Sequence, residues 1–364
     1  MRGAVLRATT SLAISIVIAA VAIGVSLGVI WLAHGPPGGA LSALWDGAFG
    51  SPDQIEGTVV KMIPLCLIAL GWIVAFSALR INVGFEGQIL VGGVVSAVIA
   101  LEVHGLPHFV HLPLAIAGAI AGGAAFAALP AWLWARRHVN EIITTLLLNF
   151  VAIQLVSWLV RGPLQEPTHS RAETGQFPAS ARWPHVSGQP TLTWDFLYIP
   201  FLVLVVAIVL ARTSFGFRLR LTGANQEAAR HAGIRTVRMG VYALVLSGAL
   251  AGLAGSSLIL SSENGAMTDN FSANYGFDGI VTALLARNSP IGVVPAALLF
   301  AALRQGGGLM EARIGVSSSL VLVTQGIVIV LLAGSSILLR RRPSLGVEAE
   351  EQPLESRRGL AEAS

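Results

Sequence analysis

Two glutamates interrupt long apolar stretches of this chain, and their chemistry most needs an explanation. Glu86 lies in the sequence Asn-Val-Gly-Phe-Glu-Gly-Gln, residues 82–88, and Glu141 stands at the start of an apolar run. A carboxylate at the centre of a bilayer costs ~2.5–3.5 kcal/mol on insertion scales, so such groups usually face a cavity or a partner. If both glutamates are deep, they indicate a polar site. If they lie at helix ends, they cap helices or pair with Arg80 and Arg136.

Polar side chains continue from Glu141 along the helix that it begins. Glu141, Thr145 and Asn149 are spaced four residues apart and therefore share one helix face, with Thr144 close beside it. A polar stripe of this kind either lines a solute pathway or forms hydrogen bonds between helices. The spacing alone favours neither interpretation.

The segment around Glu86 predicts a break in an apolar helix. Asn82 and Glu86 are four residues apart, but Gly84 and Gly87 disfavour a regular helix between them. A glycine-flanked polar break suggests a discontinuous helix, whose exposed backbone groups can hold a solute near the membrane midplane. The candidate translocation path therefore comprises Asn82, Glu86, Gln88, Glu141, Thr144, Thr145 and Asn149.

A third group of functional candidates lies in a polar segment, residues 212–238, that separates two apolar runs and carries six arginines. Within it, Glu-Ala-Ala is followed by a glycine four residues after the second alanine. The pattern predicts a short helix with a compact face that could dock against a partner, and an ordinary amphipathic loop is the alternative. We expect an N-cap at the asparagine, a carboxylate near the positive helix start and a glycine terminator. The candidate residues are Gly223, Asn225, Glu227, Ala228, Ala229 and Gly233.

The composition predicts that these candidate residues are carried by membrane helices. The 364-residue chain is 54% hydrophobic and only 12% charged, about half the charged fraction of a typical soluble domain. Forty glycines suit closely packed membrane helices, where small residues let backbones approach. Apolar runs long enough to cross ~30 Å of hydrocarbon occur at 12–33, 59–79, 112–135, 142–161, 196–211, 239–262 and 318–339.

Three further segments, 83–101, 277–286 and 289–303, are short or interrupted by polar residues. Together these runs predict an all-α polytopic membrane protein with about ten transmembrane or partly spanning helices, some of them discontinuous. We expect one membrane domain over 1–339, followed by a disordered cytoplasmic tail over 340–364.

The basic residues predict the orientation. With the N-terminus inside, 17 of the 23 lysines and arginines fall on the cytoplasmic side and six on the other. The positive-inside rule therefore favours N-in and C-in, with loop 212–238 in the cytoplasm and the proline-rich loop 162–195 outside. This asymmetry also accounts for the net charge of +4, so we expect no nucleic-acid partner.

The chain shows no signature of an enzyme. It has no GxxxxGK[ST] phosphate loop, and its one cysteine, Cys66, lies inside a predicted span. We expect no catalytic residue, metal or cofactor, so any ATP that drives the protein must be hydrolysed by another subunit.

Four motifs, in order, resemble those of the branched-chain amino acid and simple-sugar permease superfamily of ATP-binding-cassette (ABC) transporters. Residues 223–233 resemble the cytoplasmic coupling loop of ABC-importer permeases, and residues 82–88 resemble the superfamily signature, closest to its nucleoside-importer branch. Two more stretches match that branch: Asn-Glu-Ile-Ile-Thr-Thr-Leu-Leu-Leu-Asn, 140–149, and the region from Tyr-Gly-Phe-Asp-Gly-Ile, 275–280, to Gly292. Asp278, Ala286 and His231 depart from the usual residues of the branch.

The resemblance implies a permease subunit of an ABC importer in the bacterial cytoplasmic membrane, translocating a small polar solute. Nucleosides are the expected substrate, and a pentose or hexose is the alternative. The implied partners are an ABC ATPase, a second related permease in a heterodimer, and an extracytoplasmic solute-binding lipoprotein. The rival from another class is an ion-coupled secondary transporter that uses Glu86 or Glu141, although such a transporter needs no coupling loop.

Overall fold

A computed structural model of the chain describes residues 37–189 and 191–315, together with Gly24 and Gly326. The predicted spans 12–33 and 318–339 and the tail 340–364 otherwise lie outside the described residues. In the described part the protein is helical, with isolated β-bridges but no strand. The helices are α2 Pro37–Phe49, α3 Pro52–Ser77, α4 Phe85–Glu102, α5 His108–Arg137, α6 Glu141–Val160, α7 Tyr198–Arg212, α8 Ser214–Ala224, α9 Gln226–His231, α10 Thr236–Leu260, α11 Tyr275–Leu285 and α12 Val293–Ile314.

Seven helical segments in the described residues are long and apolar enough to cross a membrane, which confirms an all-α multi-pass membrane protein. They are α3, α4, α5, α6, α10, the segment Trp194–Arg212 that contains α7, and Val293–Arg313 of α12. The 11-residue α11 is apolar but too short to span by itself.

Two of the segments predicted to be short or interrupted form continuous helices. The interruption predicted in 83–101 precedes the helix instead of dividing it, because α4 begins only after Gly84 and runs without interruption from Phe85. The segment 289–303 is also longer than predicted, because α12 continues past its apolar part to Ile314. It can do so because its polar side chains Arg304 and Gln305 find partners inside the protein.

Side-chain caps explain where several helices begin. Ser51 accepts a hydrogen bond from the Gln54 amide at the start of α3, and Pro52 occupies the first turn. Asn140 caps α6 and Thr213 caps α8 in the same manner. Each cap satisfies one backbone N–H that the first helical turn leaves free.

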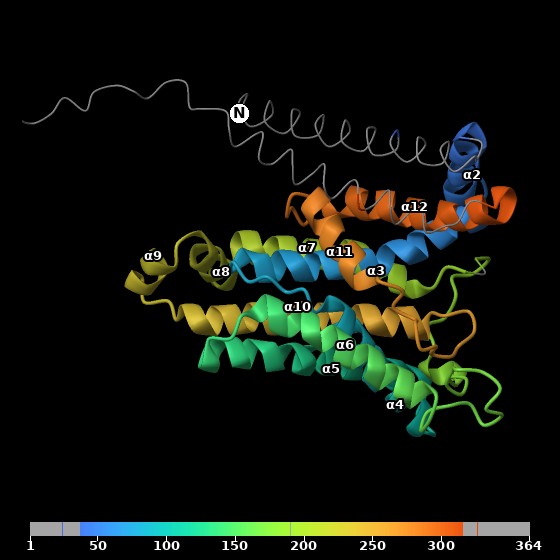
Figure 1. Ribbon diagram of the computed structural model, residues 1–364, viewed down its shortest axis with the longest axis horizontal. Coiled ribbons are helices and arrows are strands. Elements are labelled where there is room, and N and C mark those ends of the chain that lie inside the picture. Colours follow the sequence, from blue (N-terminus) through green and yellow to red (C-terminus); the bar gives the residue numbers. More distant parts are fainter. Residues whose placement is uncertain (1–23, 25–36, 190, 316–325, 327–364) are drawn as a thin grey trace, which may run out of the picture.

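α10 lies in the centre of the bundle, packed against α3, α4 and α5, while α12 packs on α2 and α3 (Figure 1). Small residues permit this packing: a Cβ on Gly252 would overlap the carbonyl oxygen of Ala119, and one on Gly248 would overlap Ala127. Gly248 and Gly252 therefore serve packing within the bundle.

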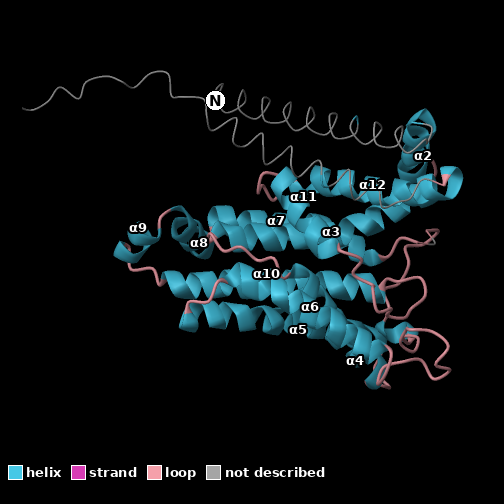
Figure 2. Ribbon diagram, viewed as in Figure 1, coloured by secondary structure: helices cyan, strands magenta, loops and turns pink. Residues whose placement is uncertain are grey.

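The polar segments gather at opposite ends of the bundle. Helices α8 and α9 project at one end, and the long loop between α6 and α7 covers the other (Figure 2). That loop is attached to the end of α10 and the segment after it, through Trp183 N–H to Leu260 O (3.0 Å) and Thr174 N–H to Met267 O (3.0 Å). Loops 162–195 and 212–238 thus lie apart, as predicted, although which compartment each faces stays a prediction.

Candidate functional site

The segment between α3 and α4 enters the bundle and carries the first predicted site residue. Asn82 is fully buried, and its Nδ2 donates to Gln88 Oε1 (2.9 Å) and Ser247 Oγ (2.7 Å). Ser247 is the twelfth residue of the 25-residue α10, so Asn82 lies near the middle of that helix. The polar break predicted at 82–88 therefore exists as a loop that precedes α4.

The polar stripe of α6 holds this loop in place. Thr145 Oγ1 accepts a hydrogen bond from Val83 N–H (3.2 Å), and Asn149 Oδ1 accepts one from Gly87 N–H (2.9 Å). Asn149 Nδ2 also donates to the Val83 carbonyl (2.9 Å). Thr145 and Asn149 are buried as one face, whereas the Thr144 hydroxyl bonds only to backbone carbonyls of its own helix start.

Glu141, the first residue of α6, forms an ion pair. Its Oε1 lies 3.0 Å from Arg80 Nη1, and both side chains are largely buried. The Arg80 guanidinium also lies over the Trp134 ring, 4.4 Å from its centroid, an arrangement that adds cation–π attraction. Of the two situations considered for Glu141, the structure shows the pairing with Arg80.

Glu86 belongs to the first turn of α4, and its side chain lies against the start of α11, which comes much later in the chain. Its carboxylate accepts hydrogen bonds from the Ser272 hydroxyl, the Asn274 amide (3.1 Å) and the Gly276 amide (2.8 Å). The side chain is 4% exposed. Because the N-terminus of a helix carries partial positive charge, a buried carboxylate is well placed there. The N-terminal ends of α4 and α11 consequently meet inside the bundle at Glu86.

A second buried pair adjoins this meeting point. Arg304 of α12 binds Asp278 of α11 (2.8 Å), and its guanidinium lies over the Tyr275 ring, 3.9 Å from the centroid. Lys61 and Arg304, two of the six basic residues counted on the non-cytoplasmic side, lie within α3 and α12.

The segment 223–233 forms the expected short helix. Asn225 Oδ1 accepts a hydrogen bond from Ala228 N–H (3.0 Å), and Gly233 adopts a φ of +76° just beyond α9. These observations confirm the N-cap and the glycine terminator. Glu227 and Ala228 are exposed, but Ala229 is fully buried. The docking face predicted from both alanines therefore includes only Ala228, because Ala229 packs inside the chain.

The other predicted residue of this segment touches the α3–α4 loop. A Cβ on Gly223 would lie 2.5 Å from the Ser77 carbonyl oxygen and 3.1 Å from the Leu79 amide nitrogen. Only glycine allows α8 to approach the end of α3 so closely. The backbone of the exposed α8–α9 unit is thus in direct contact with the loop that leads to Asn82.

Comparison with known proteins identifies the family of this chain. Residues 54–333 match the family described as the permease component of the branched-chain amino acid transport system. The chain belongs to this family. It is therefore a membrane subunit of an ABC transporter, a translocation component and not an enzyme, and the family implies a separate ATPase. The rival interpretation as an ion-coupled secondary transporter is set aside.

Relatives of this permease are named for different solutes. The glucose ABC transporter permease protein TsgB13 of Haloferax volcanii is 36% identical over 349 residues, covering 91% of this chain and 89% of the relative. The guanosine ABC transporter permease protein NupP of Bacillus subtilis is 32% identical, covering 81% and 85%. A second guanosine permease protein of that organism, NupQ, is 25% identical, covering 68% and 79%.

Three residues that complete the permease's buried polar centre were not among the predicted site residues. Ser247 binds Asn82, Ser272 binds Glu86, and Arg304 binds Asp278. The two serines carry no sequence signal, because a hydroxyl is tolerated anywhere in a membrane helix or loop. Arg304 did carry one, since a charge beside an apolar run indicates a buried partner when the helix continues through it.

Proposed function

We propose that this permease works in an ABC importer of nucleosides, one of two related permease chains in the complex. The nucleoside assignment is supported by the motifs at 82–88, 140–149 and 275–292 and by the likeness to guanosine permeases. A simple sugar is the second candidate, and the glucose permease relative favours it.

The observation that carries the mechanism is the contact of Gly223 with Ser77 and Leu79. In the mechanism that we propose, the ATPase binds the exposed face of α9 and displaces α8 when ATP is bound. Because α8 touches the end of α3, this displacement reaches the loop of Asn82. The loop then alters access to the solute at the meeting point of α4 and α11.

The proposed path runs along the buried polar centre between these elements. Both α4 and α11 begin in this centre, as do helices at the solute sites of other transporters, and the polar side chains that cap them are the groups proposed to meet the solute. The members of the path remain those proposed from the sequence: Asn82, Glu86, Gln88, Glu141, Thr144, Thr145 and Asn149.

The proposed complex has two permeases because each chain supplies one coupling segment and ABC transporters have two ATPase sites. The two guanosine permeases of one organism support a heterodimer. We place 212–238 in the cytoplasm and 162–195 outside, where that loop would receive a solute-binding lipoprotein. The membrane is the cytoplasmic membrane of a bacterium.

The experiment is to co-express the permease with its ATPase and partner permease, purify the complex and measure uptake of labelled nucleosides and sugars. Glu227→Lys should abolish both ATPase co-elution and uptake, because it reverses the charge on the exposed face of α9. Glu263→Lys is the matched control: Glu263 is also exposed but follows the opposite end of α10. A complex that stays intact after deletion of residues 227–229 would refute the coupling role, and uptake of sugars alone would replace the nucleoside assignment.

A further inference from the structure

Three arginines surround a cavity at the start of α10. Arg218 of α8 and Arg235 and Arg238 at the start of α10 line a cavity of about 370 Å³, together with Gly233 and Tyr242. All three arginines are exposed, no acidic residue lines the cavity, and none of them forms an ion pair with another described residue. The guanidinium groups are therefore available to an anion from outside the chain.

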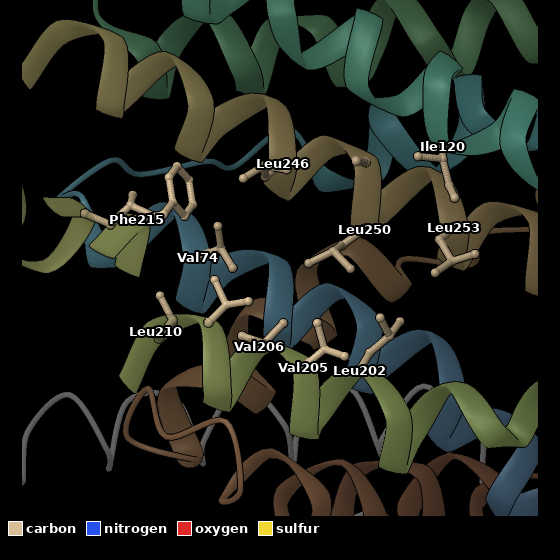
Figure 3. A pocket seen from close by; sticks show the side chains of 13 residues that line it. Val74, Ile120, Leu202, Val205, Val206, Leu210, Phe215, Leu246, Leu250 and Leu253 are labelled. Carbon is tan, nitrogen blue, oxygen red and sulfur yellow. The ribbon is translucent and has the colours of Figure 1, made fainter. Parts of the chain in front are cut away.

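An apolar groove runs between α7 and α10. Its cavity volume is about 270 Å³, and every residue that lines it is apolar. Leu202 and Val206 of α7 face Leu246, Leu250 and Leu253 of α10 across it (Figure 3). Phe215 lies at one end of the groove, and Val74 of α3 contributes to its wall (Figure 3).

The cavity and the groove lie along one face of α10. Their α10 residues follow at helical spacing, namely Arg238, Tyr242, Leu246, Leu250 and Leu253. Tyr242 and Leu246 are 50% and 41% exposed, so the two spaces adjoin at a surface open to the bilayer.

The length of this face matches one leaflet of a membrane. The 16 residues from Arg238 to Leu253 rise about 22 Å in a helix, about half the 40–45 Å of a bilayer with its headgroup regions. The charges lie at the end of the predicted span and the apolar groove lies within it, as the head and chain of a lipid would require.

We propose that this face binds one anionic phospholipid. Its phosphate lies among Arg218, Arg235 and Arg238, because guanidinium groups match phosphate oxygens in geometry and charge. One acyl chain occupies the groove between α7 and α10. A soluble protein segment on the arginines would leave the adjoining exposed Tyr242 and Leu246 in the bilayer, whereas a lipid covers both regions.

The test is native mass spectrometry of the full-length permease, purified with phosphatidylglycerol or phosphatidylcholine. Each arginine near a membrane surface contributes about fivefold to binding an anionic lipid, so Arg218→Gln, Arg235→Gln and Arg238→Gln together should weaken retention of phosphatidylglycerol on the order of 100-fold. The control removes three other exposed arginines, Arg137, Arg212 and Arg220, from the same end of the bundle. It should retain phosphatidylglycerol, and the unmodified permease should prefer that lipid over phosphatidylcholine.

A groove variant and a competition distinguish a lipid from a bare anion. Ala249 lines the groove, so Ala249→Phe should reduce lipid retention while leaving the arginines intact. Inorganic phosphate should displace phosphatidylglycerol poorly, because it cannot fill the groove. Equal loss in both arginine variants, full displacement by phosphate, or loss of ATPase co-elution with unchanged lipid retention in the first variant would each overturn the proposal.

Discussion

At the scale of single residues, Asn149 shows how a buried amide attaches one helix to another. It bonds the Val83 carbonyl and the Gly87 amide, and both Asn149 and Gly87 are buried. We predict that Asn149→Leu destabilises the purified permease by about 1–3 kcal/mol for each of these groups. Thermal unfolding in detergent measures this loss.

The matched control for Asn149 is Thr144→Val, because the Thr144 hydroxyl bonds only within its own helix start. It should change the unfolding temperature little. If Asn149→Leu leaves stability intact but stops uptake, Asn149 contacts the solute and its packing role is secondary. The two interpretations of the polar stripe are separated by this pair of measurements.

At the scale of elements, a single carboxylate organises part of the long loop between α6 and α7. Glu166 Oε1 accepts hydrogen bonds from Ser170 Oγ (2.6 Å) and from the Ser170 and Arg171 amides (3.1 and 2.9 Å). Hydrogen bonds hold the pKa of Glu166 below its ordinary value of 4.5, and the bond from the Ser170 side chain has the largest effect. The charged form is thus the one that stabilises the turn.

Since the folded pKa is lowered, this stabilisation is present above pH 4.5 and is lost as the pH falls through the folded value. We predict that the hydrogen-exchange protection of the Ser170 and Arg171 amides, measured relative to their intrinsic exchange rates, falls in acid. Glu166→Gln should produce the same loss of protection at neutral pH. Glu263→Gln, an exposed carboxylate after α10, should leave these two amides unchanged. Unaltered protection in Glu166→Gln would contradict the prediction.

At the scale of the whole molecule, the distance between α5 and α10 is set by glycines. A Cβ on Gly252 would meet backbone atoms of Ala119, which cannot move without displacing α5, whereas one on Gly118 would meet the flexible end of Ile99. We predict that Gly252→Ala destabilises the bundle by about 1–3 kcal/mol through overpacking. Gly118→Ala should cost little, because the Ile99 side chain can rotate.

Thermal unfolding of the two alanine variants, compared under one detergent condition, checks this difference. Both substitutions raise intrinsic helix propensity equally, so any difference reflects the neighbouring atoms. Equal unfolding temperatures would show that α5 and α10 can separate without cost, and the account of the central packing would then be wrong.

Features that depend on residues close together in the chain could be predicted from the sequence. Apolar runs located the spans around α3, α5, α6, α7 and α10, because hydrocarbon thickness fixes their length. Asn225 and Gly233 marked the ends of α9, because capping uses atoms only a few residues away. The family could be recognised because its motifs are short, continuous stretches of sequence.

Contacts between helices that are distant in the chain could not be predicted and are known only from the folded bundle. Glu86 receives its hydrogen bonds from residues 186 to 190 positions away, and Asn82 meets Ser247 across 165. No local pattern encodes such partners, since they follow from the close approach that glycines permit between helices. The burial of Ala229 and the groove beside α10 arise in the same way, because burial and cavities belong to the packed bundle and to no single segment.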